Sequence, residues 1–261
     1  MSRNDPGMHA AYVLHARPYR ESSLLLELLV HGMGRVGAVA RGVRGAKSGA
    51  RRAALQPLQP LHVGLQCRGE LALLTHCEAA SQPLAIRGDA LLAALYVNEL
   101  CQRLLPRDEP VDELFLRYAS CLAELAEGGV LAAPLRRIEW ALLEATGYGI
   151  DVSRDAAGSA LQEDARYWLD EHGALLRRPV EARPTVAGAT LLALVAGETL
   201  PAGSEALALR RLLRDRLSAV LGPRPLRCWG VLDELAELRR VDPAQSGAPR
   251  ASSAAQAASK D

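Results

Sequence analysis

The residues of this chain that could do chemistry are cations without nearby acids. Between Glu27 and Glu70 there is no aspartate or glutamate, but there are seven basic residues: Arg35, Arg41, Arg44, Lys47, Arg51, Arg52 and Arg68. The whole chain carries a formal net charge of only +1, so the acids are concentrated elsewhere. A basic segment without local counter-charges favours a surface that binds a polyanion. A solvated basic surface is the alternative interpretation.

Small residues separate the cations from Arg41 to Arg52, where Gly, Ala and Ser alternate with basic side chains. Such a segment can fit its backbone to phosphate groups while its guanidinium groups neutralise them. We therefore predict that this segment is a mobile loop that binds DNA through its phosphates. A loop that is merely disordered at the surface is the alternative.

Aromatic and basic residues also occur together near Tyr12 and Tyr19, where Arg17 and Arg20 are close in sequence. A tyrosine beside an arginine can stack bases in a single-strand groove, so we include Arg17, Tyr19 and Arg20 among the DNA-binding residues. Packing in the core is the alternative for both tyrosines. Aromatic residues make up only 4% of the chain, which indicates binding that depends on phosphates and has little sequence preference.

Other chemistry finds little support in the sequence. Gly32, Gly34 and Gly37 match the G-x-G-x-x-G pattern, but no acid follows at the distance needed to hold a ribose, so we interpret them as hairpin and strand-crossing glycines. The spacing of the histidines and cysteines between 62 and 77 fits no zinc pattern. No catalytic motif is recognisable. We expect no metal, no cofactor and no enzymatic activity.

Short apolar segments separated by turn residues position the basic residues. Five segments of strand length precede residue 80: Tyr12–Ala16, Leu24–Val30, Val36–Ala40, Leu58–Gln66 and Glu70–Cys77. Gly64, inside an apolar run, indicates a bulge or a bend. Five short strands in this length predict a barrel of the OB type over residues 10–80, after a flexible arm at 1–9.

Beyond Pro83 the apolar residues recur at helical spacing. We predict three helices, ending before Pro106, at Gly128 and at Gly147, then a β-hairpin of Arg166–Leu169 and Ala174–Arg177. Further helices are expected at Thr185–Ala196, Glu205–Leu221 and Trp229–Arg240. The fold class is thus α+β, with a helical domain over 81–240 and a disordered tail at 241–261.

A second candidate site lies on the third of these helices, where Arg136 and Arg137 precede an apolar face. A groove between amphipathic helices with an arginine at its rim suits an acidic peptide with a hydrophobic tip. A solvated basic first turn is the alternative.

Composition sets the remaining bounds. The chain has 261 residues, 49% of them hydrophobic, and no apolar run long enough to span a membrane. Its five cysteines are odd in number, widely scattered and form no Cys-x-x-Cys motif, which favours reduced thiols in the cytoplasm. We expect a cytoplasmic protein, associated with the nucleoid, without a membrane partner.

Several short motifs in one order resemble the RecO family of bacterial recombination mediators. They are Y-V-L at 12–14, R-P-Y-R-E-S-S-L at 17–24, G-R at 34–35, A-R-G-V-R at 40–44, L-Q-P at 55–57, G-E-L at 69–71, L-R-R-I-E-W-A-L-L at 135–143, G-Y at 147–148 and L-G-P-R-P-L at 221–226. The resemblance covers roughly residues 10–240. Many members hold a four-cysteine zinc site after the central helix, but residues 151–180 contain no cysteine, so the chain is similar to the zinc-free branch.

The resemblance implies an OB barrel joined to a helical domain, which binds single- and double-stranded DNA and anneals complementary strands. It also implies a RecR-type partner, help in loading the RecA recombinase, and contact with the acidic C-terminal tail of single-strand-binding protein, here through Arg136 and Arg137. An RNA- or ribosome-associated OB protein and a pure peptide adaptor remain the alternatives. RNA preference would indicate the first, and an isolated barrel without nucleic-acid affinity the second.

Overall fold

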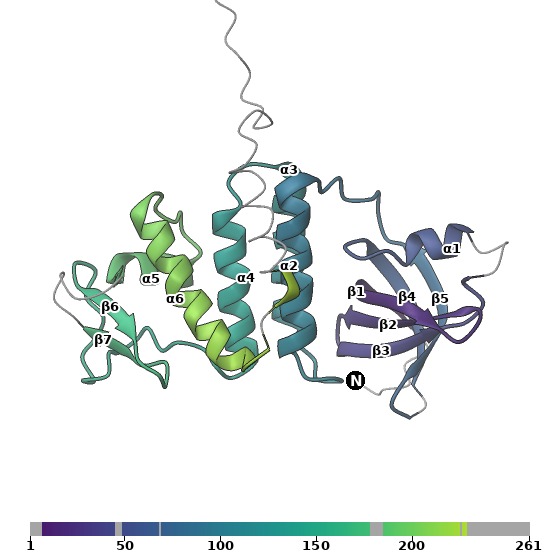
Figure 1. The fold of residues 1–261 in the computed structure, drawn as a ribbon, viewed down its shortest axis with the longest axis horizontal. Helices are drawn as coiled ribbons and strands as arrows, with labels where there is room; N and C mark the ends of the chain where they lie inside the picture. Colours follow the sequence, from purple (N-terminus) through teal and green to yellow (C-terminus); the bar gives the residue numbers. More distant parts are fainter. Residues whose placement is uncertain (1–6, 45–48, 68, 178–184, 225, 229–261) are drawn as a thin grey trace, which may run out of the picture.

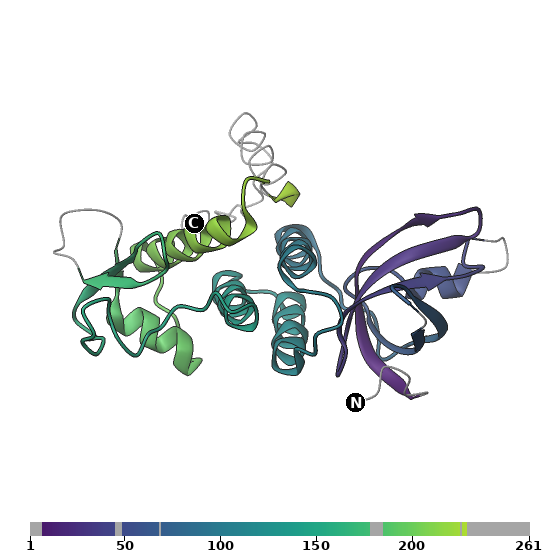
Figure 2. The ribbon, with the colours of Figure 1, turned by 90° about the horizontal axis from the view of Figure 1, so that it is seen from below.

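The computed structural model describes residues 7–44, 49–67, 69–177, 185–224 and 226–228. It is elongated, with a β-barrel at one end, long helices in the middle and a small sheet beside two further helices at the other end (Figures 1 and 2). The predicted α+β fold class, a five-stranded barrel followed by a mainly helical domain, is confirmed.

The barrel is closed by a short parallel contact. Its elements are β1 (Met8–Tyr19), β2 (Ser23–Val30), β3 (Gly34–Ala40), α1 (Gly49–Ala54), β4 (Pro60–Cys67) and β5 (Ala72–Ala79). The strand order is β1-β2-β3-β5-β4, and β4 pairs with β1 to complete the circle. All pairs are antiparallel except β3 with β5, which pair only through Ala38 with Ala72 and Val39 with Leu73. This two-residue contact is the seam of the barrel.

Every second side chain along the strands points into the barrel and fills its core. In β2, Leu24, Leu26 and Leu28 point into the barrel core, because successive residues of a strand face opposite sides. Gly32 and Gly34, with positive φ of 77° and 73°, turn the chain between β2 and β3 as predicted. The bulge predicted at Gly64 is confirmed by a shift of register between Gly64 and Leu65.

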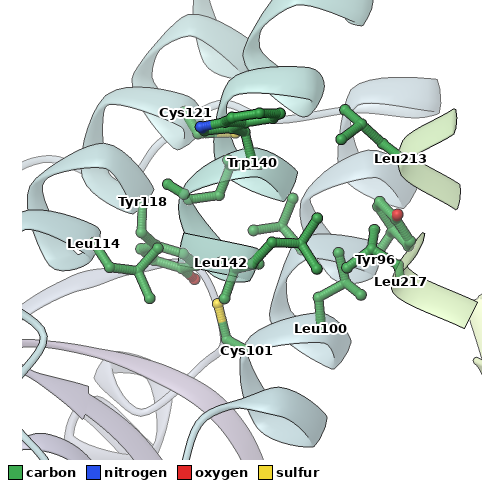
Figure 3. Packing of buried hydrophobic residues seen from close by; sticks show 14 of the residues in the cluster. Tyr96, Leu100, Cys101, Leu114, Tyr118, Cys121, Trp140, Leu142, Leu213 and Leu217 are labelled. Atoms are coloured by element: carbon green, nitrogen blue, oxygen red, sulfur yellow. The ribbon is translucent and has the colours of Figure 1, made fainter. Parts of the chain in front are cut away.

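Three long helices and α6 form the second core. The elements after the barrel are α2 (Gly88–Leu104), α3 (Asp112–Glu127), α4 (Ala132–Ala145), β6 (Arg166–Leu169), β7 (Leu175–Arg177), β8 (Val186–Ala187), α5 (Gly188–Ala196) and α6 (Ser204–Leu221). Figure 3 shows Leu100, Tyr118, Leu142 and Leu217 meeting between these helices, and all four are buried. The helical spacing in the sequence therefore marked the correct buried faces of α3 and α4. In α2 the leucine spacing was misleading, because Leu91 and Leu95 are exposed, whereas Ala94, Tyr96 and Val97 are buried.

The barrel and the helices share one hydrophobic cluster. Tyr12, Leu14 and Leu29 of the barrel belong to the same buried cluster as the helical core. At Leu14 the pairing of β1 with β2 shifts register. The amide of Asn98 in α2 donates to the Leu14 carbonyl oxygen at 3.2 Å, and the Tyr118 hydroxyl donates to the Asn98 side-chain oxygen. These buried polar contacts fix α2 and α3 against the barrel.

Several elements differ from the sequence-based predictions. The basic segment predicted as a loop contains the helix α1, and the helical domain contains a third short strand, β8. Strand β1 begins at Met8, inside the range predicted as an arm. The helix predicted at 229–240 and the tail predicted at 241–261 lie outside the described residues.

Candidate nucleic-acid interface

A row of side chains crosses the outer face of the barrel at the end that carries the β1–β2 turn. Strand pairing places Arg17 beside Leu25, Leu25 beside Val39, Val39 beside Leu73, and Leu73 beside Gln66. Because their neighbours along each strand fill the barrel, these five residues face outward. In OB barrels the face of strands 2 and 3, between the loops that join strands 1–2 and 4–5, binds oligonucleotides and oligosaccharides.

A groove of about 690 Å³ lies on this face. It is lined by residues of the β1–β2 turn, by the start of β5 and its preceding loop, and by Val39, Arg41 and Gln66. Tyr19 and Arg20 line it together, with the Arg20 guanidinium carbon 5.2 Å from the centre of the Tyr19 ring. The structure therefore brings Tyr19 and Arg20 to one groove with Arg41, which is distant from both in sequence.

Four of the predicted DNA-binding arginines have no acidic partner among the residues that the structure describes. None of the described carboxylates forms an ion pair with Arg41, Arg44, Arg51 or Arg52. The Arg44 guanidinium donates instead to the Arg20 carbonyl oxygen at 3.2 Å, and that of Arg51 to the Leu74 carbonyl oxygen at 3.3 Å. Backbone carbonyls orient these guanidiniums without cancelling their charge. Of these four arginines Arg41 lines the groove itself, and no described carboxylate pairs with it.

Arg35 differs from the other cations of the segment. Its guanidinium lies 3.3 Å from a Glu27 carboxylate oxygen, and Arg107, from the loop after α2, pairs with the other oxygen. Burial lowers the pKa of Arg35, and the nearby Glu27 carboxylate acts in the opposite direction. In sequence Glu27 lies just before the acid-free segment. In the fold its carboxylate neutralises the charge of Arg35, which belongs to that segment. Arg35 therefore belongs to the barrel–helix contact.

The remaining predicted positions divide between the surface and the interior. Arg17 is exposed at the end of the outward-facing row. Tyr12 is 8% exposed, and the centre of its ring lies 5.0 Å from that of Tyr118. Tyr12 therefore packs in the core, as the alternative interpretation expected. Lys47 lies outside the described residues.

On the helical domain, Arg136 and Arg137 point to different environments. Arg136 is 7% exposed and its guanidinium lies 2.6 Å from the Glu139 carboxylate, which also accepts a hydrogen bond from the Tyr96 hydroxyl at 2.8 Å. Burial raises the pKa of Glu139, and the Arg136 guanidinium acts to lower it. Arg136 thus lies inside the α2–α4 packing and is not a surface residue.

Arg137 lines two surface hollows, of about 640 and 300 Å³. Arg117 of α3 lines both of them as well. Apolar side chains line part of the smaller hollow, among them Leu116, which is 59% exposed, and Ile138, and Glu113, Ser120 and Glu124 line it as well. Arg137 pairs with Glu124 at 3.1 Å and Arg117 with Glu113 at 2.8 Å, so an acidic ligand would compete with these carboxylates. Two cations beside a partly apolar hollow are suited to an acidic peptide with a hydrophobic tip.

The sequence did not reveal some residues of both sites. Gln66, Leu71 and Leu73 reach the barrel groove only because β5 pairs with β3 and β4, and nothing in their local pattern marks them. Arg117 is an ordinary helix-surface arginine in sequence. Its spacing from Phe115 and Tyr118, which are buried, could have placed it at the edge of the α3 apolar face.

Metal and membrane chemistry find no matching feature in the part of the chain that the structure describes. No group of three or more His, Cys, Asp and Glu side chains there could hold a metal ion. No helix within those ranges has the length and apolar character needed to cross a membrane.

Comparison with known proteins agrees with this architecture. The family model described as Recombination protein O N terminal matches residues 8–83, and the one described as Recombination protein O C terminal matches residues 87–228. The chain is 46% identical over 232 residues to the DNA repair protein RecO of Stenotrophomonas maltophilia (strain K279a), covering 87% of this chain and 97% of that relative. It is 44% identical over 233 residues to the DNA repair protein RecO of Xanthomonas oryzae pv. oryzae (strain PXO99A), with the same coverage. The chain belongs to the RecO family of DNA repair proteins.

Proposed function

We propose that this protein binds single and double DNA strands on the barrel groove and anneals complementary strands during recombinational repair. The observation that carries the proposal is the set of arginines in the segment 41–52 with which no described carboxylate forms an ion pair: Arg41, which lines the groove, and Arg44, Arg51 and Arg52. Two DNA strands repel each other through their phosphates, and a dense cationic surface lowers that repulsion enough for bases to test pairing.

Annealing in this form requires no covalent step. The arginines neutralise charge, and base pairing between the strands supplies the driving free energy. We therefore propose that the protein acts as a mediator and not as an enzyme, without a cofactor.

The proposed site on the helical domain binds the acidic C-terminal tail of single-strand-binding protein. Arg137 and Arg117 supply the positive charge, and the apolar hollow beside Leu116 and Ile138 accepts a hydrophobic end. Arg136 supports this site from the interior, because within α4 it pairs with Glu139, whose carboxylate accepts the hydrogen bond from Tyr96 of α2. Contact with the coating protein brings the barrel to DNA that is already covered.

Together these two sites suggest a mediator that works on coated single strands. With a RecR-type partner it would help to load the RecA recombinase there. The contact among α2, α3 and the barrel holds the two proposed sites on one body, so that tail binding and strand binding act on the same DNA.

The test is a fluorescence annealing assay with complementary strands, either naked or coated with single-strand-binding protein. The full-length protein is expected to accelerate annealing of both. Arg41→Ala combined with Arg44→Ala should lose acceleration on both substrates, whereas Arg137→Ala should lose it on coated strands only. Absence of acceleration on naked strands would contradict the annealing proposal. Equal activity of Arg137→Ala on coated strands would contradict the proposed tail site.

A further inference from the structure

We propose that residues 229–240 of this chain pack as an amphipathic helix on the outward face of α2, antiparallel to it, and cover a stripe of leucines there. The segment follows Cys228, the last residue that the structure describes. The inference does not depend on DNA or peptide binding, because no residue of α2 lines the barrel groove or either hollow beside Arg137.

The outward face of α2 is apolar over the first half of the helix. Leu91 and Leu95 are 38% and 37% exposed, and Leu92 is half-buried. Residues three or four apart lie next to each other on a helix, so these leucines form one stripe. The solvent face of a surface helix normally carries polar residues. A single exposed leucine needs no explanation, but a contiguous apolar stripe indicates a surface that binds another element.

The second half of the same face already holds the C-terminal part of the chain. The Arg103 guanidinium donates to the Arg224 carbonyl oxygen at 2.9 Å. One turn earlier in α2, the Glu99 carboxylate accepts hydrogen bonds from the backbone N–H groups of Arg227 and Cys228, at 2.8 and 2.9 Å. The chain therefore follows the face of α2 in the direction opposite to that of the helix. The next turn that it reaches is the leucine stripe.

The contact with Glu99 is of the kind that begins a helix. The first N–H groups of a helix have no partner within it, and a carboxylate placed there satisfies them and favours the positive end of the helix dipole. Arg227 and Cys228, whose N–H groups Glu99 accepts, are helical. A helix that begins at these residues has its first turn anchored on α2.

The sequence of the segment matches this placement. Leu232 and Leu235 lie four and seven residues after Cys228, so on a helix all three share one side. Cys228 packs against the helical core. Asp233 and Glu237 fall on the opposite side of the same helix. A helix that continues from Cys228 thus turns its leucines toward α2 and its acids toward water.

The segment is also long enough to cover the stripe. At 1.5 Å per residue its helix spans about 18 Å, whereas Leu91 lies only about 12 Å along α2 from Glu99. In the antiparallel register set by Glu99, Leu232 lies beside Leu95, and Leu235 lies about one turn further along the stripe. Leucines then meet leucines over the whole apolar half of α2, which removes both surfaces from water.

Hydrogen exchange of the full-length protein, followed by mass spectrometry, tests the inference. The amides of 229–240 should exchange slowly, at a rate independent of protein concentration. Leu95→Glu and, independently, Leu235→Glu should speed their exchange on the order of tenfold or more, because each places a charge in the contact. Glutamate is a good helix former, so neither change opposes the helix itself. Leu207→Glu, at a 55% exposed leucine of α6 away from the stripe, is the matched control and should leave the exchange unchanged.

Each contrary result has a definite meaning. Exchange of 229–240 in the wild type at the rate of an unstructured chain would overturn the inference. Slow exchange that survives both Leu95→Glu and Leu235→Glu would also overturn it, since the segment would then pack elsewhere. A wild-type dimer in sedimentation that Leu95→Glu dissociates, with exchange that rises on dilution, would assign the stripe to a second copy of the chain instead. Because Leu235→Glu leaves α2 unaltered, it tests the contact even where Leu95→Glu disturbs α2.

Discussion

Asn98 of α2 donates its side-chain amide to the carbonyl oxygen of Leu14 in β1, at 3.2 Å, where the pairing of β1 with β2 shifts register. A bulge in a strand leaves backbone groups without a ladder partner, and buried carbonyls require one. Asn98 satisfies this need from another domain and is itself oriented by the Tyr118 hydroxyl. The irregularity in the barrel thus becomes the point at which the helices attach.

Replacing Asn98 by leucine should destabilise the protein. The change leaves the Leu14 carbonyl and the Tyr118 hydroxyl buried without a partner, which costs about 1–3 kcal/mol. Urea unfolding followed by circular dichroism measures the loss. Tyr118→Phe should cost less by itself, and the double variant should show that the two effects are not additive. A change below about 0.5 kcal/mol in Asn98→Leu would show that the contact does not stabilise the joint.

Gly34→Ala tests the same joint from the opposite side. Gly34 has φ of +73°, and a Cβ there would lie 1.7 Å from the Glu109 carbonyl oxygen. The loop after α2 must therefore move away from β3. We expect a loss of more than about 2 kcal/mol of stability, beyond the roughly 1 kcal/mol of left-handed strain alone. Gly42→Ala is the matched control, because Gly42 has φ of +69° but open space around its Cα. Equal losses of stability in the two variants would show that the close approach of Gly34 to the Glu109 carbonyl oxygen adds nothing to the cost of the substitution.

The fold was largely predictable from the local sequence pattern. The elements that the prediction missed are those that leave no such pattern. The short apolar segment Leu24–Val30 between turn residues predicted a strand, and the helical spacing of the leucines around Leu100 and Leu122 predicted helices. Helix α1 was missed because its composition, with Gly49 and two arginines, is dominated by charge and has no apolar stripe. Strand β8 is two residues long and is defined only by its pairing with β6.

The sites were less predictable, because the arginines differ in partners that are distant in sequence. Arg35 was grouped with Arg41 by its place in an acid-free segment, yet it pairs with Glu27. Arg136 and Arg137 are neighbours in sequence, but on a helix they point about 100° apart. One faces Glu139 in the interior and the other faces the surface. The residue types reveal where charge is present, and only the packing decides which charge is available to a ligand.

The buried ion pair between Arg136 and Glu139 predicts that the loss of stability in one variant depends on pH. Arg136→Leu leaves Glu139 buried without its counter-charge, which should cost about 3–5 kcal/mol near neutral pH. Burial already raises the pKa of Glu139 in the folded protein, and loss of Arg136 raises it further. A carboxyl group with a raised folded-state pKa binds its proton more tightly in the folded state, so its penalty falls as the pH drops through that pKa.

Urea unfolding at neutral pH and near pH 5 measures this effect. The difference in stability between wild type and Arg136→Leu should shrink at the lower pH. Arg117→Leu is the control, because its ion pair with Glu113 is exposed and should contribute within about 0.5 kcal/mol at either pH. A deficit in Arg136→Leu that is the same at both pH values would contradict an ionised Glu139 as its cause.

Arg137→Ala should weaken binding of a labelled peptide copied from the acidic tail of single-strand-binding protein by about tenfold. The reason is that a charge-assisted hydrogen bond contributes roughly 1.5–3 kcal/mol. Glu124→Gln should strengthen binding, because it removes the carboxylate that competes for the Arg137 guanidinium at 3.1 Å. Isothermal titration calorimetry measures both. Arg87→Ala is the control, because Arg87 is exposed and lies outside both hollows, and it should leave the peptide affinity unchanged. An unchanged peptide affinity in Arg137→Ala would contradict the proposed site.

The most direct measurement of the central claim is the salt dependence of single-strand DNA affinity, compared between wild type and the variant with Arg41, Arg44, Arg51 and Arg52 all replaced by alanine. Affinity of the wild type should fall steeply as salt rises, and each phosphate that the variant no longer neutralises should flatten the log–log slope by about 0.7. Arg35→Ala, which removes a cation already paired with Glu27, should change the slope far less. An equal slope and affinity in the wild type and the four-arginine variant would contradict the claim that this surface binds DNA.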